Sequence, residues 1–390
     1  MSPTDQGGRS ASAARESFDA YARAGVDVAA ADRAVELMRT SVKATLGPEA
    51  LGALGGFAGL WDATALKDYD QPILVTSTDG VGTKLAIAQA MDIHDTVGYD
   101  LVGMVVDDVV VTGAKPLFMT DYIATGKVDP ARIAAVVAGI AAACEHTGTA
   151  LLGGETAEHP GLMGPSEYDI AGAAVGVVER SELLGPDRVG QGDVVLGLAS
   201  SGLHSNGFSL VRAVVRELGW AWDRPVAEFG RTLGEELLEP TRLYTRSVLA
   251  LARRLGNDLH ALAHVTGGGL AANLSRVLPA PLGAVVSRAS WPVPPVFQLL
   301  GSAGHVTWLD LERSLNMGIG MAAVVAEPAL GAASAALAEL GEQAVPIGRV
   351  ALAADVRAEA ENRGARAEDL TQGAKGVEGG AVLLIDEYHR

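Results

Sequence analysis

The chain has 390 residues and carries 30 Lys and Arg against 47 Asp and Glu, which gives a formal net charge of −17. Nucleic acid and anionic membranes are therefore not expected as partners, because both are bound through clustered positive charge. The 48 glycines show no regular period and are expected in turns and ligand loops, and a hydrophobic content of 48% suffices for a sizeable core.

The chain opens with a polar leader, followed by a helix and a glycine-rich loop. Residues 1–16 have no basic segment ahead of an apolar run, so a secretory signal is not expected. Apolar residues at every third or fourth position predict a helix at 32–47. Four glycines follow within 52–59, and such a loop either moves or lets its backbone approach a ligand closely.

Strands and helices then alternate to the end of the chain. Strands are predicted at 73–78, 117–125, 150–152, 194–199, 262–265, 283–286, 317–325, 344–350 and 381–385, and helices at 96–113, 130–146, 208–218, 241–255 and 270–277. This alternation indicates an α/β or α+β fold in layers. The stretch 184–192, rich in glycine and proline, is the expected linker between two halves, and 354–378 is expected to be a surface excursion.

One cysteine and short apolar runs indicate the compartment. Cys144 stands alone, so no intrachain disulfide can form and a reducing cytoplasm is expected. The most apolar stretches, such as 133–143, fall short of the roughly 20 residues that cross a bilayer. We therefore expect a soluble cytoplasmic protein.

Two familiar nucleotide motifs are missing. The Gly126–Lys127 pair is followed by Val128 instead of Ser or Thr, which excludes the P-loop motif. Neither Gly55–Gly59 nor Thr266–Leu270 fits the dinucleotide fingerprint G-x-G-x-x-G, so a hydride-transfer enzyme is disfavoured.

Two acidic segments are candidates for metal and phosphate binding. In Thr78–Lys84, Asp79 could hold a hard cation while neighbouring glycines expose backbone N–H groups to phosphate oxygens. Asp107 and Asp108 lie at the negative end of a helix dipole, an unfavourable position that a metal ion would reverse. Each segment also has a simpler explanation when taken alone. The first can be an ordinary β-turn with a solvated lysine, and the second a solvated pair of surface acids.

Three further segments follow predicted strands. Gly153–Gly161 holds two acids and His159, which suits the edge of an active site, although one histidine is a weak metal signal. The turns at 200–207 and Thr266–Gly269 precede helices and could bind an anion, but Ser and Asn there can also be simple N-caps. The alternating glycines of 317–321 favour a strand packed closely on another backbone.

Taken in order, these segments resemble the phosphoribosylformylglycinamidine cyclo-ligases, the aminoimidazole ribonucleotide synthetases of purine biosynthesis. The matching motifs are Tyr21-x-x-Ala-Gly-Val-Asp27, the loop 52–59, Thr78-Asp-Gly-Val-Gly-Thr-Lys84, Pro116-Leu-Phe-x-x-Asp-Tyr-x-Ala-Thr-Gly-Lys127, Gly153-Gly-Glu-Thr-Ala-Glu158, Ser200-Ser-Gly-x-His-Ser-Asn-Gly207, Glu239-Pro-Thr-Arg242, His264-x-Thr-Gly-Gly-Gly269 and Asn316-Met-Gly-Ile-Gly-Met321. The resemblance covers about residues 21 to 350.

The resemblance implies a two-domain α/β (α+β) fold and a homodimer. The N-terminal sheets would pair into a barrel in the dimer, and a mixed sheet with helices would form the C-terminal domain. The expected parts are a flexible leader, helix and glycine-rich loop at 1–60, an ATP-binding and dimerisation domain at 61–183, and an α/β domain with an extended tail at 184–390.

The implied reaction uses ATP with Mg²⁺, and K⁺ is a further candidate cofactor. Phosphorylation of the formamide oxygen of formylglycinamidine ribonucleotide creates a good leaving group, and the amidine nitrogen then closes the ring, so the protein must position the phosphoryl group and stabilise its charge. The alternatives are a related ATP-dependent small-molecule kinase or selenophosphate-type synthetase, and a non-catalytic nucleotide-binding homodimer.

The resemblance also implies roles for single residues. Asp79 and Asp108 would hold Mg²⁺, Lys84 would offset phosphate charge, and His204 and Asn206 would face the reacting amidine or phosphate. The expected ATP contacts are Gly55, Gly56, Gly80, Gly82, Thr83 and Glu155, the expected substrate contacts are Ser205, Thr266, Gly267, Gly268 and Gly269, and Glu158 is a further candidate for polar or metal contacts.

The chain departs from the family's pattern in four places. Asp107 stands where Asn is usual, Lys115 where an acid is common and Leu315 where Phe is usual, and the segment after Val350 exceeds the usual C-terminus.

Overall fold

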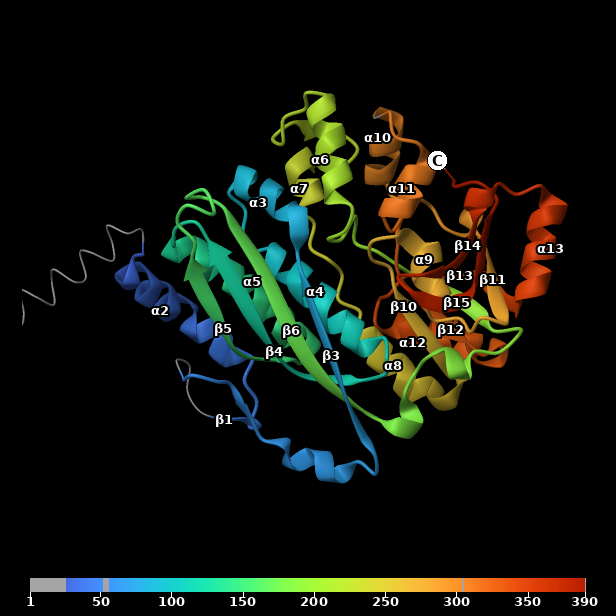
Figure 1. Ribbon diagram of the computed structural model, residues 1–390, viewed down its shortest axis with the longest axis horizontal. Coiled ribbons are helices and arrows are strands. Elements are labelled where there is room, and N and C mark those ends of the chain that lie inside the picture. The colour runs from blue at the N-terminus through green and yellow to red at the C-terminus, as the bar shows by residue number, and fades with distance from the viewer. Residues whose placement is uncertain (1–25, 52–55, 304, 390) are drawn as a thin grey trace, which may run out of the picture.

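The structure is a computed structural model that describes residues 26–51, 56–303 and 305–389. It has two halves, each built around one β-sheet, which lie side by side in Figure 1. The N-terminal half contains α2 (Val28–Ala44), β1 (Ala50–Leu51), β2 (Leu60–Trp61), β3 (Pro72–Gly80), α3 (Leu85–Met91), α4 (Val97–Val110), β4 (Lys115–Thr125), α5 (Pro130–Thr147), β5 (Ala150–Glu158) and β6 (Tyr168–Glu179). Its four-stranded sheet has the order β3-β6-β4-β5, with only β4 and β5 parallel.

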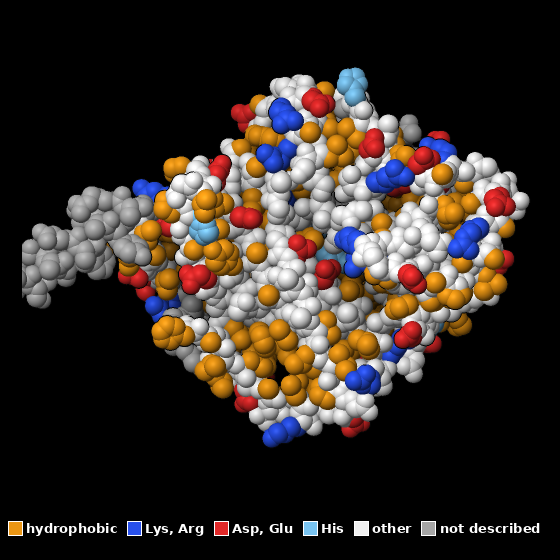
Figure 2. Space-filling model, viewed as in Figure 1, with side chains coloured by type: hydrophobic (Ala, Val, Ile, Leu, Met, Phe, Trp, Pro, Cys, Tyr) orange, Lys and Arg blue, Asp and Glu red, His pale blue; other side chains and the backbone are white. Residues whose placement is uncertain are grey.

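Helices cover one face of the N-terminal sheet. Ile73 and Val75 of β3 point into the core, where α4 packs against β3 and β6, while Leu74 on the other face is 60% exposed. The opposite face is turned to the viewer in Figure 1, and in Figure 2 hydrophobic side chains gather there over the lower part of β3, β4 and β6. The alternation along the strands thus leaves an apolar sheet face open in the single chain.

The C-terminal half contains a larger mixed sheet of order β10-β12-β7-β13-β11-β15-β14. Its elements are β7 (Val194–Ala199), α6 (Phe208–Glu217), β8 (Pro225–Val226), β9 (Arg231–Thr232), α7 (Leu233–Leu237), α8 (Thr245–Leu255), β10 (Leu259–His264), α9 (Gly269–Ser275), β11 (Leu282–Ser287), α10 (Pro295–Ala303), α11 (Trp308–Ser314), β12 (Ile319–Val325), α12 (Leu330–Glu339), β13 (Ala344–Leu352), α13 (Ala353–Arg363), β14 (Leu370–Ala374) and β15 (Val377–Ile385). Helix α9 packs on one face, and α8, α12 and α13 pack on the other.

A continuous core joins the two halves. Leu101 and Val105 of α4 belong to the same buried cluster as Val248 and Leu251 of α8. The halves therefore pack as one unit around α4, which places the ends of β3 and α4 against turns of the C-terminal half.

The predicted α/β fold is confirmed, and most predicted strands and helices are present, with ends that differ by up to about four residues. Two predictions are wrong. The strand predicted at 150–152 does not end there, because residues 153–158 continue it as β5. Most of 354–378, predicted as a surface excursion, forms α13, β14 and the start of β15. The residues of 1–25 and 52–55, including the predicted leader, lie outside the described residues. None of the helices that the structure describes is both long and apolar enough to cross a membrane.

Strand β6 has no counterpart among the predicted elements, because its centre consists of Gly and Ala, which are poor strand formers. The structure requires these small residues. A Cβ on Gly176 would lie 2.5 Å from Cγ1 of Val109, so glycine here lets α4 lie close against the sheet.

Candidate functional site

The glycine turn after β3 docks onto the turn before α6. The hydroxyl of Ser205 donates a 2.7 Å hydrogen bond to the carbonyl of Val81, and the hydroxyls of Thr83 and Ser209 lie 3.1 Å apart. Two segments that the sequence singled out, one in each half of the chain, thus meet at the junction. Ser205 itself is buried and used in this contact, whereas Thr83 is exposed.

Two carboxylates lie at this junction. Asp79 ends β3 with an exposed side chain, and Asp108 in the last turn of α4 keeps 41% of its side chain exposed. Oδ1 of Asp108 lies 2.9 Å from Nδ1 of the buried His264. Burial disfavours the charged imidazole, but the hydrogen bond and charge of Asp108, helped by Asp107 and Asp79, still raise the pKa of His264.

Asp108 contacts His264 directly, and the charge of Asp79 acts on the same imidazole from a longer distance. His264 was not among the predicted site residues, although it opens the motif His264-x-Thr-Gly-Gly-Gly269 and could have been found there. Its ring holds the carboxylate of Asp108 in one orientation, as a residue behind a metal ligand typically does.

The donor set fits a magnesium ion that arrives with phosphate. Among the described residues, no group of three or more His, Cys, Asp or Glu could hold a metal by itself. Mg²⁺ is commonly bound by one or two carboxylates together with substrate phosphates and water. Asp79 and Asp108 provide such a partial set of oxygen ligands.

Lys84 does not lie where its predicted role requires. Its side chain is fully buried, and Nζ donates to Oδ1 of Asp100 at 2.8 Å and to the carbonyls of Glu239 and His204 at 2.8 and 3.0 Å. Burial lowers the pKa of Lys84 and raises that of Asp100, and their contact opposes both shifts. Because all three ammonium hydrogens are used, Lys84 joins the two halves and does not contact an incoming phosphate in this geometry.

Asp107 serves the fold at the same junction. It is fully buried, and its carboxylate accepts hydrogen bonds from the backbone N–H of Tyr244 and the hydroxyl of Thr245 at the start of α8. The carboxylate departs from the family's usual Asn, but it caps a helix and faces away from the exposed Asp108.

His204 lies just beneath the surface of the junction. Its ring is buried, Nε2 accepts a 3.2 Å hydrogen bond from the N–H of Ser201, and Nδ1 has no partner among the described residues. Burial lowers the pKa of His204 well below its usual value, so the ring is neutral. A Cβ on Gly320 would lie 2.4 Å from Cε1 of this ring, so glycine here lets β12 lie close against side chains, whereas the sequence predicted close packing on another backbone. The predicted role of His204 at the reacting group stays a prediction, for which the ring has its Nδ1 left over.

Asn206 and the Thr266–Gly269 loop lie side by side in the structure. A Cβ on Gly267 would lie 3.3 Å from Oδ1 of Asn206. Gly268 is exposed, and Gly269 has a φ of 73° with its Cα so close to the carbonyl of Glu312 that a Cβ would lie 1.9 Å from that oxygen. Gly267 and Gly268 therefore remain available to a ligand, while Gly269 is required by packing.

A second group of predicted contacts lines a pocket of about 510 Å³ between α2 and strands β4 and β5. Gly56 and Glu155 line it, and Gly55 lies outside the described residues. Glu158 does not belong to this pocket, because its two carboxylate oxygens accept hydrogen bonds from the backbone N–H groups of Asp27 and Val128.

The pocket and the carboxylates share one row of the sheet. Asp79 pairs with Gly172, Gly172 with Asp121, and Asp121 with Gly154. Three strand spacings of about 4.8 Å separate the ends of this row, or about 14 Å. Two predicted ATP contacts follow Asp79 in the chain. The backbone N–H of Gly80 already donates to the Asp79 carboxylate, whereas Gly82 is exposed.

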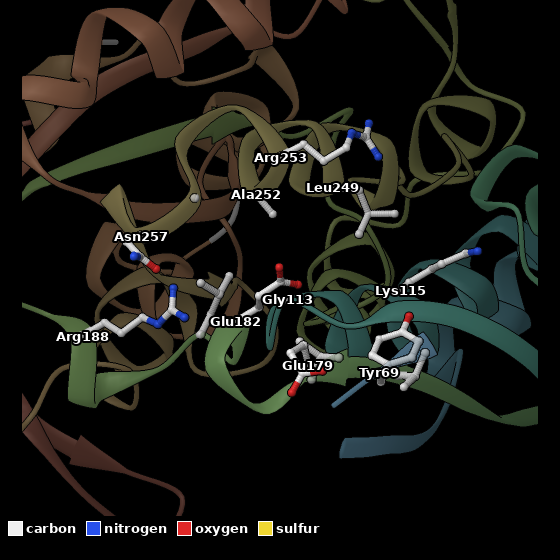
Figure 3. Close-up of a pocket in the computed structure, with 14 residues that line it drawn as sticks. Tyr69, Gly113, Lys115, Glu179, Glu182, Arg188, Leu249, Ala252, Arg253 and Asn257 are labelled. Carbon is white, nitrogen blue, oxygen red and sulfur yellow. The ribbon is translucent and has the colours of Figure 1, made fainter. Parts of the chain in front are cut away.

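Another cavity, of about 430 Å³, lies between the segment 182–188 and α8 (Figure 3). Glu182 projects toward its middle, with Arg188 and Asn257 at one end and Tyr69 at the other. Lys115, one of the departures from the family's pattern, also lines it. None of the predicted site residues does, so this cavity is separate from the junction site.

Comparison with known proteins matches both halves of the chain. The family model of the N-terminal domain of AIR synthase related proteins matches residues 61–178, and that of the C-terminal domain matches 190–360. The phosphoribosylformylglycinamidine cyclo-ligase of Brevibacillus brevis is 50% identical over 333 residues, which cover 85% of this chain and 95% of the relative. That of Gloeobacter violaceus is 50% identical over 337 residues, which cover 86% and 99%.

Solved structures share the fold at low sequence identity. The hydrogenase maturation protein HypE in complex with ATP is 20% identical, with a TM-score of 0.59 over 92% of this chain and 95% of HypE. Thiamine-monophosphate kinase from Stenotrophomonas maltophilia is also 20% identical, with a TM-score of 0.58 over 81% and 93%. At this identity, the likeness shows the fold alone.

Proposed function

This chain belongs to the phosphoribosylformylglycinamidine cyclo-ligase family, and from that premise we propose that the junction of its two halves is the site of phosphoryl transfer. The chain is an ATP-dependent ligase that forms aminoimidazole ribonucleotide in purine biosynthesis. The observation that supports the location of the site is the pair of accessible carboxylates, Asp79 and Asp108, of which Asp108 contacts the buried His264.

Asp79 and Asp108 would hold Mg²⁺ on the phosphates of ATP. When bound, the ion would neutralise charge on the phosphate oxygens during transfer to the formamide oxygen. His264 fixes the orientation of Asp108 through the 2.9 Å hydrogen bond. A chain with a net charge of −17 would thus attract anionic substrates through local groups.

We place the nucleoside part of ATP in the pocket of about 510 Å³ beside Gly56 and Glu155. Its walls include Ala34, Met38 and Val42 of α2, which offer an apolar surface for a base. The cross-sheet row connects this pocket to Asp79, so one extended nucleoside triphosphate could reach from the pocket to the carboxylates.

The substrate would occupy the C-terminal side of the junction. Asn206 lies there together with the accessible Gly267 and Gly268, which follow His264 closely in the chain. Lys84 and His204 act as positioning residues in this proposal. Lys84 joins the two turns through the carbonyl of His204, and the buried His204 ring accepts a hydrogen bond from Ser201 within its own turn.

A homodimer formed through the open face of the N-terminal sheet is part of the proposal. Leu74 is 60% exposed and Tyr122 is 42% exposed on strands of one sheet, and Figure 2 shows further hydrophobic side chains on the same face. Closing two such sheets on each other would bury this surface and form the barrel that the resemblance implies. The single buried Cys144 suits a reducing cytoplasm.

Incubation of the purified protein with formylglycinamidine ribonucleotide, ATP and Mg²⁺ tests the proposed function. We expect aminoimidazole ribonucleotide and ADP in equal amounts, and parallel reactions with Na⁺ or K⁺ test the monovalent ion. Parallel assays with thiamine phosphate and with selenide test the two alternative reactions. Turnover of either alternative by folded protein that makes no aminoimidazole ribonucleotide would overturn the proposal.

A further inference from the structure

A lysine occupies an unusual position in the C-terminal hairpin. Strands β14 and β15 are joined by the two-residue turn Lys375-Gly376, whose φ angles are 51° and 78°. Two positive φ angles define a type I′ turn, in which Asn, Asp or Gly is favoured at the first position. A lysine there adopts a strained backbone conformation, and no local structural need explains the choice. The turn lies beyond residue 360, where the family model of the C-terminal domain ends.

Polar contacts connect Lys375 to the glycine loop of the junction site. Its Nζ lies 3.4 Å from Oγ1 of Thr266, and that hydroxyl donates to Oδ1 of Asn273 at 3.3 Å. Nη1 of Arg276 donates to the same amide oxygen at 3.2 Å. The buried Asn273 in turn donates to the carbonyls of Thr266 and Gly269, which fixes the loop.

Two cations therefore flank the loop without an acidic partner. No ion pair joins Lys375 or Arg276 to a carboxylate within the part of the chain that the structure describes. In this acidic protein, most other basic groups near the C-terminus are paired, such as Arg288 with Glu312 and Asp369. An exposed ammonium beside exposed backbone glycines is a site for an anion.

The same salt-bridge network fixes the hairpin relative to the loop. Arg288 joins Asp369, next to β14, to Glu312 of α11, and the carbonyl of Glu312 packs against Gly269. The hydroxyl of Tyr388, after β15, also donates to Glu312. The position of Lys375 over the loop is therefore set by buried contacts at both ends of the hairpin.

We propose that Lys375, with Arg276 behind it, binds the 5′-phosphate of the ribonucleotide substrate against Thr266, Gly267 and Gly268. The proposal rests on the proposed function and adds a specificity-determining residue to it. A phosphomonoester bound here would lie against a loop that begins two residues after His264. Its ribose would therefore extend toward the carboxylates that hold the transferred phosphoryl group. Segments after residue 360 would thereby become part of the substrate site.

Steady-state kinetics of Lys375→Met, Lys375→Arg and the control Lys67→Met test the proposal. Lys67 is exposed in the N-terminal half and contacts none of the site residues named above. A charge-assisted contact to phosphate is worth about 1.5 kcal/mol or more, so Lys375→Met should raise KM for the ribonucleotide about tenfold, with KM for ATP unchanged. Lys375→Arg should restore most of the affinity, and Lys67→Met should behave like the unchanged protein.

The dephosphorylated nucleoside serves as a second substrate that separates phosphate binding from a general disturbance. We expect Lys375→Met to lower kcat/KM for the ribonucleotide and leave kcat/KM for the nucleoside unchanged. Equal losses for both, or no change in KM for the ribonucleotide, would overturn the proposal.

Binding of ribose 5-phosphate, measured by calorimetry, makes the test independent of turnover. Weaker binding by Lys375→Met than by the unchanged protein is expected even if the reaction is not the proposed one. Equal binding by the two proteins would refute the role of Lys375, whereas missing product with normal Lys375-dependent binding would refute only the proposed function.

Discussion

Asp107 and Asp108 are neighbours in α4, yet their surroundings assign them different roles. Asp108 keeps 41% of its side chain exposed beside His264, whereas Asp107 is fully buried and caps α8. The sequence predicts both at the end of a helix but does not distinguish their roles, because the helix that Asp107 contacts lies about 140 residues away in the chain. Only the tertiary contact with Tyr244 and Thr245 decides which carboxylate serves the fold.

Asp108→Asn should lower kcat for aminoimidazole ribonucleotide formation by a hundredfold or more, on the order of the loss caused by removing one electrostatic stabiliser. The matched control is Asp107→Asn, since an Asn oxygen can also accept from the N–H of Tyr244 and the hydroxyl of Thr245, so kcat should stay nearly unchanged. Steady-state rates of the two folded variants make the comparison. Similar losses in both would contradict the assignment of Asp107 to the fold.

Asp121 should make stability depend on pH. It lies in the sheet beside Gly154, and burial raises its pKa to about 7, above the value of about 3.9 in an unfolded chain. The native state therefore holds its proton more tightly, so the charged carboxylate lowers stability as pH rises from about 4 through 7. Asp121→Asn removes this cost at high pH only.

The free energy of unfolding of Asp121→Asn minus that of the unchanged protein should increase by roughly 2–3 kcal/mol between pH 5 and pH 8. Urea denaturation at the two pH values measures this difference without bound nucleotide. A difference that is the same at both pH values would show that the carboxylate is not buried in the native state.

Single residues also show where sequence reasoning reached its limit. The junction of the Asp79 turn with Ser205 and Asn206 was predictable as a set of motifs, because each segment follows a strand or precedes a helix. The burial of Lys84 was not, since its partners Asp100 and Glu239 come from elements with no local relation to it. A lysine that a sequence motif suggests is solvated can thus be buried and can join the two halves of the chain.

At the scale of elements, close helix packing depends on glycine. A Cβ on Gly98 of α4 would lie 2.1 Å from the backbone nitrogen of Ile140 in α5, whereas a Cβ on Gly331 of α12 meets nothing within 4 Å. Both glycines are the second residue of their helices, so the same substitution tests two different surroundings.

Gly98→Ala should lower the free energy of unfolding by about 1–3 kcal/mol or more, because α4 and α5 must move apart. Gly331→Ala should leave it unchanged or raise it by up to about 1 kcal/mol, because alanine favours the helix. Chemical denaturation of both variants provides the measurement. A destabilising Gly331→Ala or a harmless Gly98→Ala would contradict the packing described for α4.

Elements with a strong local pattern were predictable, and those fixed by tertiary contacts were not. Strand β7 matches its predicted bounds, as expected for a continuous apolar run. Strand β6 was missed because Ala and Gly fill its centre, and α13 because its buried face consists only of Ala353, Val356 and Ala360. Both elements are stabilised by tertiary contacts: β6 pairs within its sheet, and α13 packs against the other sheet.

At the scale of the whole molecule, the open face of the N-terminal sheet predicts the oligomeric state. Leu74→Lys places a charge on the apolar face, and we expect the protein of 40.0 kDa per chain to change from a dimer to a monomer. Leu340→Lys is the control, because Leu340 is 49% exposed at the end of α12 in the other half. Sedimentation equilibrium of both variants and the unchanged protein measures the mass; a dimeric Leu74→Lys variant would exclude this face as the interface.

The course of the formyl oxygen tests the central claim about the whole molecule. If ATP phosphorylates the formamide oxygen before ring closure, that oxygen must leave with phosphate. Turnover of formylglycinamidine ribonucleotide labelled with ¹⁸O in the formyl group, followed by mass spectrometry of the inorganic phosphate, shows where it goes. The account predicts one ¹⁸O in each phosphate released, and aminoimidazole ribonucleotide formed with unlabelled phosphate would contradict it.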